Sequence, residues 1–87
     1  MEYNQCQKDM IYYVIDYSKN AKGKLTPCVE VFKQIFRQKY RNLEIEENAR
    51  ALVSSGTLKP YSFHEYLWLT EAFITSLDYK LFINKKI

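Results

Sequence analysis

His64 is the only histidine, and it is followed directly by Glu65, so two residue types suited to acid–base chemistry are adjacent. An imidazole beside a carboxylate can exchange protons near neutral pH. The pair lies where we expect a hairpin turn, however, and an exposed turn offers no cleft to hold a substrate. We therefore interpret His64 as a solvated turn residue, without a catalytic or metal-binding role.

The two thiols, Cys6 and Cys28, are the candidate nucleophiles. Cys28 follows an expected helix start, where the helix dipole favours a thiolate. It also lies on an apolar stripe, and buried cysteines commonly serve as small hydrophobes, so a structural role is the stronger interpretation. The cysteine spacing is not that of a metal site. Reduced thiols in the cytoplasm are the expectation, and a disulfide between the two stays open.

Three glutamates, Glu44, Glu46 and Glu47, form an acidic cluster. Adjacent carboxylates at a helix start usually form a solvated face that complements the helix dipole, and a divalent cation needs more oxygen ligands than this run offers. The chain has two glycines, and neither a phosphate loop nor a dinucleotide-binding pattern is present. The sequence therefore predicts no enzyme, no cofactor and no metal.

The elements that would position these residues follow from the spacing of apolar side chains. A length of 87 residues with 47% hydrophobic content predicts one domain, 1–87, with a real core. Runs rich in aromatic and branched residues indicate two strands of a hairpin. The expected helices cover 6–18, 26–41, 43–55 and 70–83, and the expected strands cover 57–63 and 65–69.

Three finer features complete this prediction. Thr26 and Pro27 are typical of an N-cap and a first helical residue, so they should start the second helix. Residues 24–26 would form a very short strand beside the hairpin. The apolar line of the last helix is expected to consist of Phe73, Leu77 and Leu81.

Two phrases around the hairpin carry a family resemblance. The sequence LVSSGTL (52–58) ends a helix at a glycine and opens a strand, and LTE (69–71) ends a strand and starts a helix. In this order the chain resembles the winged helix-turn-helix family, whose hairpin is called the wing. The resemblance implies a mainly α fold with a small antiparallel β-hairpin, in the order α-(β)-α-α-β-β-α.

The resemblance also implies double-stranded DNA as a partner and transcription regulation as a role. The net charge of +3 is unevenly distributed: +4 over 1–42, −4 over 43–79 and +3 over 80–87. Cations four residues apart on the second helix would contact phosphates, although a solvated helix face explains them equally well. The expected DNA-binding residues are Lys33, Arg37 and Arg41 on that helix, Arg50 and Ser54 toward the bases, and Lys59 on the wing.

An alternative is a protein-binding module, such as a phage-type inhibitor or an adaptor. The acidic third helix would repel phosphates, and its carboxylates would attract a basic partner. The aromatic tip of the wing would dock on a protein, stack on a base or fold back onto the core. The expected residues are Glu44, Glu46, Glu47, Tyr61 and Phe63.

Self-association is a further expectation, because the first and last helices are apolar over more than one face. We expect a homodimer through Ile11, Tyr12, Ile15, Ile74 and Phe82. No apolar run approaches the roughly 20 residues of a membrane span, and the polar start lacks a signal-peptide pattern. The expected location is the cytoplasm.

Overall fold

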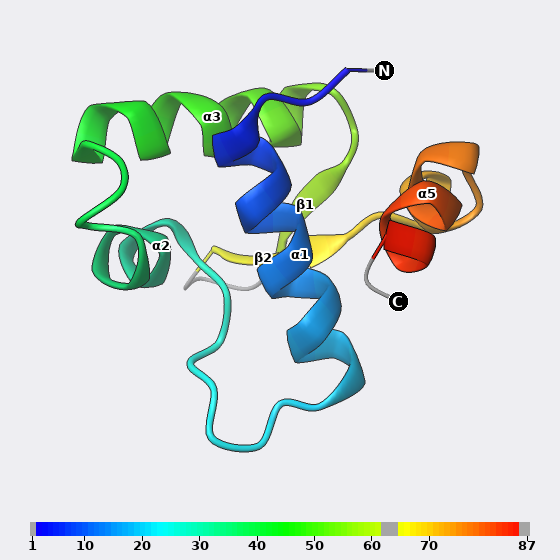
Figure 1. The fold of residues 1–87 in the computed structure, drawn as a ribbon, viewed down its shortest axis with the longest axis horizontal. Helices are drawn as coiled ribbons and strands as arrows, with labels where there is room; N and C mark the ends of the chain where they lie inside the picture. The colour runs from blue at the N-terminus through cyan, green and yellow to red at the C-terminus, as the bar shows by residue number, and fades with distance from the viewer. Residues whose placement is uncertain (1, 62–64, 86–87) are drawn as a thin grey trace.

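The computed structural model describes residues 2–61 and 65–85 and has the expected α+β class. These residues are mainly helical, with one two-stranded antiparallel sheet. Figure 1 shows α1 in front of the hairpin, with α2 and α3 to one side and α5 to the other. The elements are α1 (Gln5–Lys19), α2 (Val29–Ile35), α3 (Asn42–Ser54), β1 (Leu58–Tyr61), β2 (Tyr66–Leu69), α4 (Glu71–Ile74) and α5 (Leu77–Lys85).

The first helix supplies the largest share of the core. Asn4 caps it: its side chain accepts from the Gln7 amide at 2.8 Å, and the Gln7 side chain accepts from the Asn4 amide at 3.1 Å. This reciprocal pair satisfies two backbone donors that a helix start leaves without partners. The buried face of α1 consists of Cys6, Met10, Ile11, Val14 and Ile15.

The prediction that Thr26 and Pro27 start the second helix is wrong, because α2 begins at Val29 with Cys28 as its N-cap. The Thr26 hydroxyl instead shares a hydrogen bond of 3.1 Å with the Tyr17 hydroxyl on α1. Pro27 is buried, and its carbonyl accepts from the Leu67 amide at 2.8 Å. Tertiary contacts therefore override the local capping signal.

The second helix also ends early, at Ile35 rather than near Arg41. Turns follow, in which the Lys39 and Tyr40 amides both donate to the Phe36 carbonyl. This bend lets Lys39 and Tyr40 reach a carboxylate on α1, which a continued helix would not position for them. A helix of seven residues cannot carry the expected cationic stripe.

The third helix and the hairpin agree with the prediction. Ile45, Ala49 and Leu52 form the buried face of α3, and Gly56 follows with a φ of +81°, the left-handed conformation that favours glycine. The strands pair in an antiparallel register that sets Leu58 opposite Leu69. Residues 24–26 form no strand within the described part of the chain, so the expected third strand is wrong.

The last helix is interrupted. Thr70 caps α4 as predicted, accepting from the Phe73 amide at 3.1 Å. Ser76 then ends α4 and starts α5, because its hydroxyl donates to the Phe73 carbonyl at 2.6 Å and accepts from the Tyr79 amide at 3.3 Å. This break rotates α5, so that Phe73 stays buried while Leu77 and Leu81 are 72% and 51% exposed. The predicted apolar line is therefore wrong beyond Phe73.

Three of the five residues expected at a dimer interface lie in the core. Ile11 and Ile15 are fully buried, and Phe82 is 6% exposed. Tyr12 is half-buried, with its ring 4.9 Å from that of Phe82, and Ile74 is 43% exposed. The apolar width of α1 thus serves intramolecular packing. No helix within 2–61 and 65–85 has both the length and the apolar character needed to cross a bilayer.

Candidate interaction groove between α2, α3 and the hairpin

A groove of about 400 Å³ separates α2 and α3 from the hairpin. Its apolar lining consists of Val29, Ala49, Val53, Pro60 and Leu67. Its charged lining consists of Glu30, Lys33, Glu46, Arg50 and Glu65. An apolar floor with a few polar groups is the composition that binding sites favour.

Helical spacing and strand register place these side chains together. Glu46 and Arg50 are four residues apart on α3, and Glu30 and Lys33 are three apart on α2, so each pair shares one helix face. Pro60 and Leu67 are directly paired across the hairpin and contribute to the same wall. Each wall of the groove is thus built by regular structure.

Glu65 enters the groove from the turn position immediately before β2, with a φ of +52°. A non-glycine residue seldom adopts this left-handed conformation, and such outliers gather at functional sites. Glu65 has no ion-pair partner within residues 2–61 and 65–85. Glu65 is also exposed, so it can be reached from the groove.

Lys33 is neutralised by its own chain. Its Nζ lies 3.4 Å from a Glu30 carboxylate oxygen and makes a shorter hydrogen bond to Glu46. The bond to Glu46 raises the pKa of Lys33, and the same bond lowers the pKa of Glu46. The side chain is only 19% exposed. Lys33 therefore links α2 to α3 and is poorly placed to hold a phosphate.

The other residues expected to bind DNA do not form one stripe. Arg37 lies in the turn after α2 and Arg41 immediately before α3, and both are exposed. Arg50 is exposed in the groove, and Ser54 is exposed at the end of α3. Lys59 is exposed on β1, where its ammonium lies 5.6 Å from the centre of the Tyr61 ring.

The residues expected to bind a protein are also divided. Glu44 and Glu47 are exposed on α3, and Glu46 lies in the groove. Tyr61 is 51% exposed. Phe63, together with the turn residue His64, lies outside the described residues.

Sequence reasoning missed seven of the ten residues that line the groove. Its apolar lining and two of its carboxylates, Glu30 and Glu65, were not predicted to act together. The one local signal was the alternation of the hairpin, which sets Pro60 and Leu67 on the same face. The position of the hairpin against α2 and α3 depends on long-range packing, which no local pattern encodes.

Asp9 on α1 forms a second polar cluster, which holds the turn after α2. Its carboxylate accepts from Lys39 Nζ at 2.9 Å, the Tyr40 hydroxyl at 2.7 Å and Gln5 Nε2 at 2.8 Å. Burial opposes ionisation, but these three donors outweigh it and lower the pKa of Asp9. Burial, together with the bond to Asp9, raises the pKa of Tyr40. This cluster is structural.

The thiols are both free. Burial, with the nearby charges of Glu44 and Asp9, raises the pKa of Cys6 to about 11. A thiol so rarely ionised at neutral pH is a poor nucleophile. Cys28 is half-buried at the start of α2. In the described part of the chain, no three His, Cys, Asp or Glu side chains gather as a group that would hold a metal ion.

Comparisons of this chain with protein families, with curated proteins and with solved structures find no match.

Proposed function

We propose that this chain is a protein-interaction module on a winged helix-turn-helix scaffold, and that its groove binds a segment of a partner protein in which basic and apolar side chains alternate. The observation that carries the proposal is the lining of the groove. Five apolar residues form its floor and walls, and three of its five charged residues are carboxylates. The other two charged residues are Lys33 and Arg50, so the carboxylates outnumber the cations by one, and this balance favours a cationic segment over a polyanion.

The state of the cations supports this choice. Lys33 already pairs with Glu30 and Glu46, so it adds little positive field to the groove. Glu65 stands opposite with no ion-pair partner among the described residues. A lysine or arginine of the partner would pair with Glu65 while its neighbours pack on Val53 and Pro60. The sequence also predicts a protein-binding alternative, in which the acidic third helix contacts the partner. The present proposal retains Glu46 of that helix and places the contact in the groove.

Short labelled peptides test the proposal. We expect a peptide of alternating leucine and lysine to bind, as measured by fluorescence anisotropy, and a peptide of alternating leucine and glutamate not to bind. Glu65→Lys places a cation in the groove and should lower the affinity for the leucine–lysine peptide by at least about tenfold. The loss follows from repulsion of the peptide's lysines.

Glu47→Lys is the matched control, because it makes the same charge change at an exposed site on α3 outside the groove. The affinity of Glu47→Lys for the basic peptide should stay within about threefold of the affinity of the unmodified protein, since exposed charges are screened by salt. Equal losses in the two variants would show that binding follows net charge alone and would refute the groove.

DNA binding is the second candidate, and one observation favours it. Arg37, Arg41 and Arg50 are exposed and carry no carboxylate partner within residues 2–61 and 65–85. In the proposed scaffold, α3 would approach the major groove with the hairpin beside it. Arg37 and Arg41 would then contact phosphates, and Lys59 would contact the backbone from the hairpin.

A titration against mixed 30-base-pair duplexes at about 50 mM salt, where phosphate-driven binding is strong, tests this candidate. We expect Arg37→Glu with Arg41→Glu to abolish binding if DNA is the ligand. The matched control is Lys80→Glu, an exposed charge change on α5. Absence of binding by the unmodified protein, or equal binding by the double variant, would exclude DNA.

A further inference from the structure

The last helix, α5, packs one face inward and leaves an apolar ridge outside. Phe82 is buried, and Tyr79 and Ile83 pack against the core. Leu77 and Leu81, one helical turn apart, are 72% and 51% exposed. Two large apolar side chains left in solvent on one face are typical of a contact surface.

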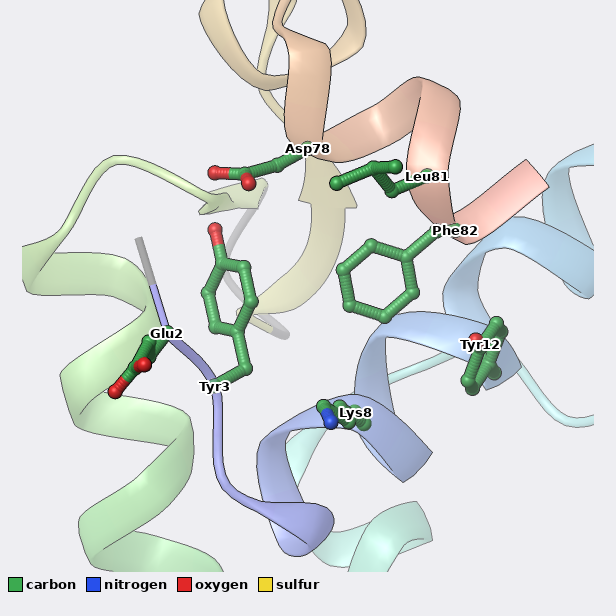
Figure 2. Close-up of a pocket in the computed structure, with 7 residues that line it drawn as sticks. All are labelled: Glu2, Tyr3, Lys8, Tyr12, Asp78, Leu81 and Phe82. Carbon is green, nitrogen blue, oxygen red and sulfur yellow. The ribbon is translucent and has the colours of Figure 1, made fainter. Parts of the chain in front are cut away.

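A hollow of about 400 Å³ lies directly beside this ridge. Figure 2 shows it between α5 and the segment that leads into α1. The Phe82 ring lies 5.6 Å from the Tyr3 ring and 4.9 Å from the Tyr12 ring, so the hollow has an aromatic floor. The remaining lining is Glu2, Lys8, Asp78 and Leu81.

We propose that this face binds a second copy of the same chain, with the ridge of each copy seated in the hollow of the other. A two-fold axis requires one surface to be complementary to itself. An apolar ridge next to an aromatic hollow meets that requirement, because a half-turn exchanges the two features. Leu77 and Leu81 of one copy then cover Tyr3, Tyr12 and Phe82 of the other.

The charges around the hollow satisfy the same requirement. Lys8 lies on the α1 side, whereas Glu2 precedes α1 and Asp78 lies on α5. In the proposed dimer, Lys8 of each copy pairs with Glu2 of the other, and the half-turn makes the two contacts identical. A foreign helix of one charge sign would meet both signs at this rim, so a second copy is the better match. This surface keeps Tyr12 and Phe82 of the predicted dimer interface, whereas Ile11 and Ile15 are fully buried in the core.

Sedimentation velocity measures the proposed dimer. We expect a dimer at about 100 µM chain, and Leu77→Glu should weaken dimerisation at least tenfold, as burying a charge does at the centre of an interface. Leu43→Glu is the matched control, because Leu43 is 64% exposed on α3. It should leave the dimer unchanged. Circular dichroism checks that both variants fold.

A charge exchange adds a test that loss of folding cannot mimic. Lys8→Glu and Glu2→Lys should each weaken the dimer, and an equimolar mixture of the two should restore it, because both lysine–carboxylate contacts are regained in the mixed pair. A monomer at about 100 µM, a dimer that Leu77→Glu leaves intact, or a mixture no tighter than its components would overturn the proposal. Capture of a foreign amphipathic helix by a monomeric chain would also overturn it.

Discussion

Replacing Phe82 by alanine is expected to destabilise the fold by about 3–5 kcal/mol. Phe82 is 6% exposed, and its ring lies within 6 Å of the rings of Tyr3, Tyr12 and Phe73. Its removal deletes three edge-on aromatic contacts and leaves a cavity between α1 and α5. Chemical denaturation should show the loss directly, and the thermal midpoint should fall by more than about 10 °C for a chain of this size.

The matched control for Phe82→Ala is Leu43→Ala, which truncates a large apolar side chain that is 64% exposed. An exposed substitution of this kind should change the free energy of unfolding by no more than about 0.5 kcal/mol. The comparison separates core packing from surface packing, and so tests the assignment of Phe82 to the core. A loss below about 1 kcal/mol in Phe82→Ala would contradict that assignment.

Replacing Asp9 by alanine is expected to cost about 2–4 kcal/mol, because three hydrogen bonds to a charged acceptor are lost at once. The Tyr40 hydroxyl and the Lys39 ammonium then have no partner on α1. The turn after α2 should loosen, and amide hydrogen exchange at Phe36–Tyr40 should accelerate. Glu47→Ala, which removes an exposed carboxylate, is the control and should have little effect on stability.

The cost of Asp9→Ala should depend on pH in one direction. The pKa of Asp9 is lower in the folded chain than its ordinary value near 3.9. The stabilisation is therefore present above about pH 4 and is lost as the pH falls through the lower folded pKa. The difference in unfolding free energy between the unmodified protein and Asp9→Ala should be larger at pH 7 than at about pH 2.5. A gap that stays constant would refute the role of the carboxylate.

Local signals predicted the elements whose structure is decided locally. The buried face of α3 follows its apolar spacing, Gly56 ends that helix in the left-handed conformation, and Thr70 caps the next one. The two strands also form where aromatic and branched residues gather. In each case the deciding interaction lies within a few residues of the signal.

The errors occur where distant residues compete with a local pattern. The spacing of residues 28–40 is helical throughout, yet α2 ends at Ile35, because the following turn lets Lys39 and Tyr40 reach Asp9. The wide apolar face of α1 suggested a dimer, but α1 lies against both the hairpin and α5, so both sides are needed for the core. An apolar residue does not indicate which molecule buries it.

The candidate groove was only partly predictable. The sequence predicts that Arg50 contacts DNA and that Glu46 contacts a protein partner, and both residues line the groove. The neutralisation of Lys33 was not predictable, because Glu46 is thirteen residues away and lies on another helix. The net charge of a surface depends on such ion pairs, and these cannot be deduced from the number of lysines and arginines in the sequence.

Position 56 is constrained by handedness rather than by size. A Cβ atom built on Gly56 would meet no heavy atom within 4 Å outside its chain neighbours, although the backbone φ is +81°. The penalty for an L-alanine there is consequently torsional, about 1 kcal/mol or somewhat more, and crowding of its Cβ adds nothing. A D-alanine has the mirror-image preference that matches this φ, so it would avoid this torsional penalty and would narrow the conformational freedom of the unfolded chain. At the junction between α3 and the hairpin, the handedness of the residue therefore decides which side chain the backbone accepts.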